Sequence, residues 1–302
     1  MPEAQSCSVF AGDDAPGVMT EFRRTHLIVA VAMLGAMNAL LRPVAVAVTE
    51  HGAIDAALVG FGINPAVWVA LVLAGMALAD SAPRPLARRD LVLATVTLCG
   101  LSIPSANVSW LVLALYGAAL CLDRRLSPAQ HTGAAILLVV ALREPIVSAA
   151  TQLLNEPLLG LDAMLVAAAL APFIEGISSE GNIVLGTDSA KLVILTGCSS
   201  VRNVSYALLF WYAVSRSMLP RLTRPVCLAG AAIAATMIAQ NVVRLALMAS
   251  SDANYDVIHG PSGQTLFQVL MLVLVIGLTS LGVRYALTHL AGGRAAAAAR
   301  AR

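Results

Sequence analysis

The sequence predicts an all-α polytopic membrane protein with about eight transmembrane helices. Two observations predict this class. Of the 302 residues, 59% are hydrophobic and 12% are charged, whereas a soluble globular protein carries about 25% charged residues. Long apolar runs also alternate with short connections, several of which carry arginine. No internal repeat of the kind found in transporters with paired halves is present.

Eight apolar runs are the expected spans. Arg23 and Arg24 precede the first run, and alternate connections carry arginines at 84–89, 123–125 and 216–224. Because basic residues accumulate in cytoplasmic loops, we expect both termini in the cytoplasm and the chain in the plasma membrane. In order, the expected spans cover 27–48, 63–79, 90–104, 107–122, 130–152, 199–219, 226–250 and 264–287.

The chain divides into one membrane domain and two tails. Residues 1–22 are acidic and contain Gly and Pro, which predicts a disordered cytoplasmic tail. Residues 23–290 form the single transmembrane domain. Residues 291–302 form an Ala/Arg-rich, low-complexity cytoplasmic tail.

Three segments are expected to lie on the outer side without crossing the membrane. Residues 157–174 are apolar but short and are bounded by prolines, which predicts a re-entrant or interfacial segment. The β-branched runs within 181–195 flank Gly-Thr-Asp-Ser and predict a small extracytoplasmic hairpin or extended loop. Residues 251–263 are expected to form an outer loop.

Cys198 lies where a polar stretch gives way to the sixth apolar run. A helix N-terminus carries partial positive charge, which favours thiolate over thiol. Arg202 follows by four residues and would share a helix face with Cys198. Both effects indicate a reactive nucleophile, although a membrane cysteine can equally be a small apolar packing residue and Arg202 an interfacial anchor.

Polar residues inside other spans are further candidates. Asn241 and Arg244 lie three residues apart near the outer end of the seventh span, so they share a helix face. Arg143 and Glu144 lie inside the fifth span, where ionisable groups are costly and often functional. Each of these residues can also have a purely structural role. Arg244 can extend its charge to the membrane surface, Asn241 can hydrogen-bond to a neighbouring helix, and Arg143 and Glu144 can neutralise each other.

The expected topology brings Cys198, Arg244 and His259 to similar depth near the outer surface. A thiolate that attacks a carbonyl, an imidazole that moves the proton and a guanidinium that stabilises the oxyanion are the parts of thiol acyl transfer. His259 can also be an ordinary loop histidine. The five scattered cysteines include no CxxC pair, so no metal site and no cofactor are expected.

Three short boxes in this order resemble the exosortase/archaeosortase family. They are Cys198-Ser-Ser-Val-Arg202, Asn241-Val-Val-Arg244 and His259-Gly-Pro-Ser-Gly263, preceded by Glu180-Gly-Asn-Ile-Val-Leu185. The resemblance covers roughly 155–275, and the first four spans match in hydropathy alone. Ser200 and Val201 stand where the family has Gly-Leu, and serine does not adopt positive φ as easily as glycine does.

The resemblance implies a membrane cysteine transpeptidase that acts on the outer face of the plasma membrane. Its partners would be exported proteins with a C-terminal signature such as Pro-Glu-Pro, a transmembrane helix and a basic tail, together with membrane lipids and no nucleic acid. Carried over, Cys198 is the nucleophile, with Arg244 and His259 as its catalytic partners. The sequence adds Arg202, Asn241, Ser199 and Arg143 as substrate-binding or supporting residues.

Two other functions fit parts of the pattern. In a multi-pass transporter, Arg42, Arg143 and Arg244 would line an anion path that does not depend on Cys198. In an intramembrane serine protease, Ser199 or Ser200 would act with His259, but no Gly-x-Ser-x-Gly context surrounds either serine.

Overall fold

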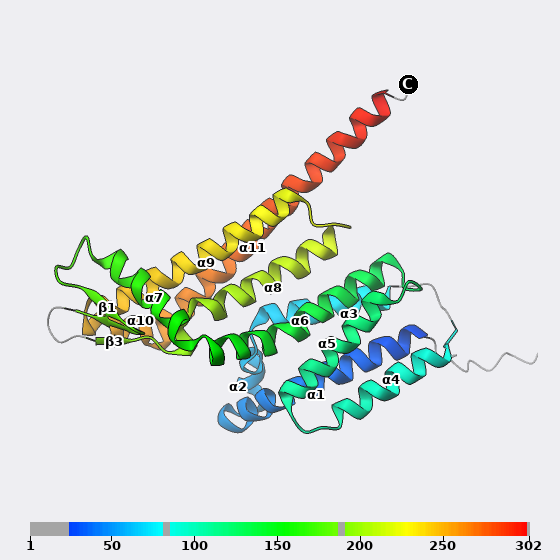
Figure 1. Cartoon of the computed structure of the whole chain (residues 1–302), viewed down its shortest axis with the longest axis horizontal. Coiled ribbons are helices and arrows are strands. Elements are labelled where there is room, and N and C mark those ends of the chain that lie inside the picture. Colours follow the sequence, from blue (N-terminus) through cyan, green and yellow to red (C-terminus); the bar gives the residue numbers. More distant parts are fainter. Residues whose placement is uncertain (1–23, 81–84, 187–190, 301–302) are drawn as a thin grey trace, which may run out of the picture.

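The computed structural model describes residues 24–80, 85–186 and 191–300, and it consists almost entirely of helices. The expected N-terminal tail, together with Cys7, lies outside these described residues. Figure 1 shows two groups of roughly parallel helices joined along one side, with a small sheet at one end. We call the groups the amino-terminal bundle and the carboxyl-terminal bundle, and the end with the sheet the cap.

The amino-terminal bundle contains five long helices and encloses the largest apolar core. Asn64 caps α3 by accepting a hydrogen bond from the Ala66 backbone N–H, and Ser127 with Gln130 forms a capping box at the start of α6. Both helices also begin with proline, which is favoured at the first helical position. The helices are α1 (Arg24–His51), α3 (Pro65–Ala79), α4 (Arg88–Leu101), α5 (Ala106–Leu122) and α6 (Pro128–Leu153), with α2 (Ala53–Leu58) and the 3₁₀ turn η1 (Gly60–Gly62) between α1 and α3.

The carboxyl-terminal bundle contains α8 (Ser200–Met218), α9 (Arg224–Ser250) and α11 (Pro261–Arg300). In Figure 1, α9 and α11 run side by side, and α11 continues well past the neighbouring helices to the C-terminus. The Ala/Arg-rich segment expected as a tail is therefore helical as far as Arg300. Its alanines have the highest helix propensity of any residue.

The cap contains α7 (Asn155–Leu170), three short strands and α10 (Asp252–His259). Strands β1 (Ser178–Glu180), β2 (Ile183–Leu185) and β3 (Lys191–Val193) form an antiparallel sheet in sequence order. The β1–β2 turn places Gly181 at φ 55°, a conformation that glycine adopts without strain. Val184 and Leu192 pair across β2 and β3, and both belong to the apolar cluster that the sheet forms with α7 and α9.

The cap differs in detail from the sequence expectations. The antiparallel pairing of β2 and β3 agrees with the hairpin expected within 181–195, and β1 adds a strand to it. The segment expected to be re-entrant or interfacial contains the regular helix α7, which lies against the sheet and α9. The expected outer loop contains α10, because the Ser251 side chain caps it by accepting a hydrogen bond from the Asn254 N–H.

Four helices are long and apolar enough to cross a membrane, which agrees with a membrane-embedded, all-α protein. They are α1, α6, α9 and the Ser262–His289 part of α11, and the apolar helices α3 and α5 are shorter. Among the described residues, four of the eight expected spans are therefore long and apolar enough to cross a membrane, and eight are not shown. Helix α4 has 14 residues, a length of about 21 Å. Helix α8 carries Arg202 and Arg216 within its 19 residues.

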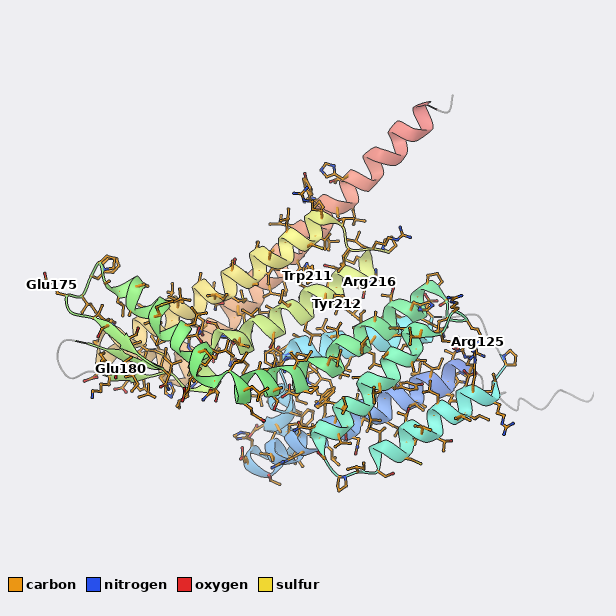
Figure 2. The ribbon with its side chains drawn as sticks, viewed as in Figure 1. Arg125, Glu175, Glu180, Trp211, Tyr212 and Arg216 are labelled. Carbon is orange, nitrogen blue, oxygen red and sulfur yellow. The ribbon has the colours of Figure 1, made fainter. Side chains whose placement is uncertain are left out.

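The charged residues labelled in Figure 2 lie at opposite ends of the molecule according to their sign. Glu175 and Glu180 lie at the cap end, whereas Arg125 and Arg216 lie at the far ends of the two bundles. We call the end with these arginines the basic end.

Candidate active site

A cavity of about 800 Å³ opens between the two bundles beneath the cap. Helices α3, α8, α9, α10 and α11 contribute to its walls. Five of the seven site residues proposed from the sequence line it: Cys198, Arg202, Asn241, Arg244 and His259. The other two, Ser199 and Arg143, do not.

Cys198 ends the 3₁₀ turn η2 (Thr196–Cys198), and α8 begins two residues later. The thiol is half-buried and is not in a disulfide. Ser199 caps the helix by accepting a hydrogen bond from the Val201 N–H at 3.3 Å. Cys198 therefore lines the cavity beside the positive end of the α8 dipole, and it also packs against the apolar cluster of the cap.

Two buried side chains from other helices hold the backbone around Cys198. Asp162 of α7 accepts a hydrogen bond from the Ser200 N–H at 3.0 Å. Asn241 of α9 donates to the Cys198 carbonyl at 2.9 Å and to the Ser200 hydroxyl at 3.1 Å. Asp162 and Asn241 are each only 3% exposed. The cysteine is thus held between α7 and α9, which gives its backbone a fixed position relative to the cavity.

Asn241 has both of the roles that its sequence position suggested: it hydrogen-bonds between helices and it lines the cavity. It is an interhelical hydrogen-bonding residue, since its Oδ1 also accepts from Asn203 of α8 at 3.2 Å. It also lines the cavity and contacts the main chain of the proposed nucleophile. Its place in the site is therefore structural support for Cys198.

Arginine supplies all the permanent charge on the cavity wall, because no Asp or Glu lines it among the described residues. Arg202 is exposed, and Arg244 is half-buried. Within the described residues, the buried Nε of Arg244 has no hydrogen-bond partner. A buried donor without an acceptor is costly, so this N–H is available to a ligand oxygen.

His259 lines the cavity from the end of α10 and is exposed. Its ring stacks on Tyr255, with centroids 5.0 Å apart and planes 13° from parallel. The Gln264 side chain donates to the His259 carbonyl at 2.7 Å, which ties α10 to α11. In the described part of the chain, neither ring nitrogen of His259 bonds to the Cys198 sulfur. Catalytic hydrogen bonds are often long before substrate binds.

Arg143 lies behind the cavity wall. It is 8% exposed and forms an ion pair with Glu144. Its guanidinium donates to the Ser205 hydroxyl at 3.1 and 2.9 Å. It also stacks over the Tyr206 ring, 3.5 Å from the centroid. Tyr206 lines the cavity, and the Ser205 hydroxyl donates to the carbonyl of the cavity-lining Arg202 at 2.7 Å. Arg143 therefore contacts the site through both of these neighbours.

The positions of these side chains give little support to a transporter or a serine protease. Of the three arginines proposed for an anion path, only Arg244 lines the cavity, whereas Arg42 is exposed on α1. Ser199 is 1% exposed and its hydroxyl is occupied as a cap. Ser200 is 5% exposed and its hydroxyl accepts from Asn241.

Sequence reasoning missed Asp162 and a set of carboxamides. Asp162 is the one charged residue within the apolar run 157–171, and that isolation was the available signal. The cavity is also lined by the side-chain amides of Asn64, Asn203, Gln240, Gln264 and Gln268. Carboxamides donate and accept together, so they match the alternating N–H and C=O groups of a peptide.

A cysteine, a histidine, two arginines and several carboxamide residues therefore line one cavity. Such a set can bind a peptide and attack one of its carbonyl groups. No family model matches the chain, and neither a curated protein nor a solved structure matches it.

Proposed function

We propose that this chain is a membrane-embedded cysteine peptidase or transpeptidase. It would cleave the C-terminal sorting signal of exported proteins and transfer them onward, as the resemblance to the exosortase/archaeosortase family implies. The observation that carries the proposal is that Cys198, Arg244 and His259 line one cavity. They come from three elements separated by up to 61 positions in the sequence.

In the proposed reaction, the Cys198 thiolate attacks the carbonyl carbon of the scissile peptide bond. Arg244, whose Nε has no partner among the described residues, donates to the developing oxyanion. The C–N bond then breaks, and protonated His259 gives its proton to the leaving amine. A nucleophile, either water or an acceptor amine, resolves the resulting thioester and returns the thiol.

The proposed orientation puts the cap outside and the basic end in the cytoplasm. The separation of Glu175 and Glu180 from Arg125 and Arg216 in Figure 2 supports it, because arginine accumulates on the cytoplasmic side. In this orientation, the cavity opens toward the side on which exported proteins arrive.

The test uses a secreted reporter fused to candidate sorting tails from the genome that encodes the chain. Each tail joins a short signature to a transmembrane helix and a basic cluster. Co-expressed wild-type chain should shorten at least one reporter, and Cys198→Ala should not. Cys99→Ala is the matched control, because Cys99 is an exposed free cysteine remote from the cavity.

Equal processing by Cys198→Ala and the control would reject the thiol mechanism. A transporter would respond differently to these substitutions. A pathway lined by Arg244 should retain its flux in Cys198→Ala and lose it in Arg244→Gln, with no reporter shortened by any variant.

A further inference from the structure

A second cavity lies at the basic end, remote from Cys198. Its volume is about 440 Å³, and residues of α4, α5 and the α5–α6 connection line it. Arg125, which lines it, is labelled at this end in Figure 2. The lining residues are Arg89, Asp90, Leu93, Ala119, Leu122, Asp123, Arg124 and Arg125.

Both carboxylates at this cavity are already engaged by arginine. Asp90 pairs with Arg24 at 3.1 Å and with Arg125 at 2.8 Å, and it also accepts the Ala87 N–H at 3.0 Å. Asp123 pairs with Arg24, with Arg89 at 3.1 Å and with Arg125 at 3.1 Å. Arg24 and the two aspartates are largely buried, so this network joins α1, α4 and α5.

The arginines at the cavity outnumber the carboxylates. Arg124 is exposed and, within the described residues, has no hydrogen-bond or ion-pair partner. Arg89 is 58% exposed and uses one nitrogen for Asp123. With Arg24 included, four arginines face two aspartates, a net charge of +2. The mouth of the cavity therefore favours an anion.

The remaining lining is apolar and continues along the helices. Leu93, Ala119 and Leu122 form the apolar part, and Leu122 is 82% exposed. Leu111 and Leu115, which are 50% and 64% exposed, lie on the same face of α5 as Ala119 and Leu122. An apolar stripe thus runs from the basic mouth along the outer surface of α5.

We propose that this cavity binds the headgroup of an anionic phospholipid. The phosphate would lie between Arg89 and Arg124, and an acyl chain would lie along the α5 stripe. Basic pockets between transmembrane helices bind lipid phosphates in this manner. A soluble phosphate compound would use the arginines but would leave the adjoining leucines uncovered, and for this reason a membrane lipid is the better occupant.

The test titrates dioleoyl-phosphatidylglycerol into the purified full-length chain in dodecyl maltoside, with native mass spectrometry counting the bound lipid. Each arginine at a membrane surface contributes about 1 kcal/mol to anionic lipid binding. Arg124→Gln should therefore weaken binding roughly 5-fold, and Arg89→Gln with Arg124→Gln roughly 30-fold. Arg124→Gln removes no hydrogen bond or ion pair within the described residues, so it should leave folding intact.

Arg221→Gln is the matched control, because Arg221 is exposed in the α8–α9 connection and does not line the cavity. It should bind phosphatidylglycerol as the wild-type chain does. Equal binding of dioleoyl-phosphatidylcholine would overturn the proposal, as would equal affinity of Arg124→Gln and the control. Competition by glycerol phosphate at the same concentration would identify a soluble anion as the ligand and would also overturn it.

Discussion

At the scale of single residues, the position of Cys198 depends on two buried side chains that carry no chemistry themselves. Asp162 and Asn241 approach the start of α8 from α7 and α9 and bond to the residues on either side of Ser199. A nucleophile at the end of a short 3₁₀ turn has few local restraints. These two bonds supply the restraint from elsewhere in the fold.

Two substitutions of Asp162 should show whether its hydrogen bond or its negative charge contributes more to stability. Asp162→Ala leaves the buried Ser200 N–H without its acceptor, and such a loss costs about 1–3 kcal/mol of stability. In Asp162→Asn, the amide oxygen can still accept, so the thermal midpoint in detergent should fall less. If the Asn variant is destabilised as much as the Ala variant, the carboxylate charge matters more than this hydrogen bond.

Substitution of Arg244 by lysine tests whether the cavity requires a planar group with two donors. Lysine would serve equally well as a snorkelling anchor, but an ammonium cannot reproduce the guanidinium geometry. Loss of an oxyanion donor costs on the order of a hundred- to thousand-fold in rate. We expect Arg244→Lys to lower reporter processing by about that factor at unchanged expression. Near-normal processing by Arg244→Lys would show that Arg244 only anchors its helix at the membrane surface.

The sequence predicted the residues of the cavity better than their contacts. The spacing of Asn241 and Arg244 and the order of the boxes were enough to select Cys198, Arg244 and His259. Arg143 looked equally suitable, because burial of a charge is visible in sequence but its partners are not. Tyr206 lies between Arg143 and the cavity, and that stacking depends on how α6 packs against α8.

At the scale of helices, the contact between α3 and α6 depends on one missing side chain. A Cβ on Gly133 would lie 2.7 Å from the Ala74 carbonyl oxygen and 2.8 Å from the Leu78 nitrogen. Both are backbone atoms of α3, so they cannot move independently of that helix. Small residues allow this close approach of helices in membranes.

Gly133→Ala should therefore destabilise the amino-terminal bundle by about 1–3 kcal/mol, the usual cost of overpacking. Gly75→Ala is the matched control on the facing helix, because a Cβ there meets nothing within 4 Å. That variant should be neutral or up to about 1 kcal/mol more stable, since alanine favours helix. Thermal unfolding in detergent compares the two, and equal midpoints would show that the helices adjust to the extra methyl.

Prediction of the elements was most accurate where hydropathy alone decides. The apolar runs gave α1, α3, α4, α5, α6, α8 and α9 to within a few residues, whereas α11 continues to Arg300, well past the expected end at 287. Helix α10 was missed because its sequence is polar, and a serine cap with tertiary contacts to α9 and α11 stabilises it. The flanking prolines predicted a re-entrant or interfacial segment over 157–174. Most of it forms the regular helix α7, with Pro157 in the first turn, where proline is tolerated.

At the scale of the whole molecule, the account requires the cap and the basic end to lie on opposite sides of the membrane. In a chain whose native cysteines are replaced, a cysteine at Asp256 in α10 should react with an impermeant maleimide in intact cells. A cysteine at Arg221 should react only after permeabilisation. Both positions are exposed in the structure. The reverse pattern would put the cavity on the cytoplasmic side, away from exported proteins.

The central claim is that Cys198 forms a covalent bond to its substrate, and mass spectrometry of that residue tests it most directly. The chain would be isolated under acidic, denaturing conditions from cells that express a processed reporter, and its cysteine-containing peptides would be analysed. The account predicts a thioester to the reporter on Cys198 that neutral hydroxylamine releases, and no adduct on Cys99, Cys121 or Cys227. An adduct on another cysteine would contradict the role of Cys198. Processing without any adduct that also persists in Cys198→Ala would contradict it as well.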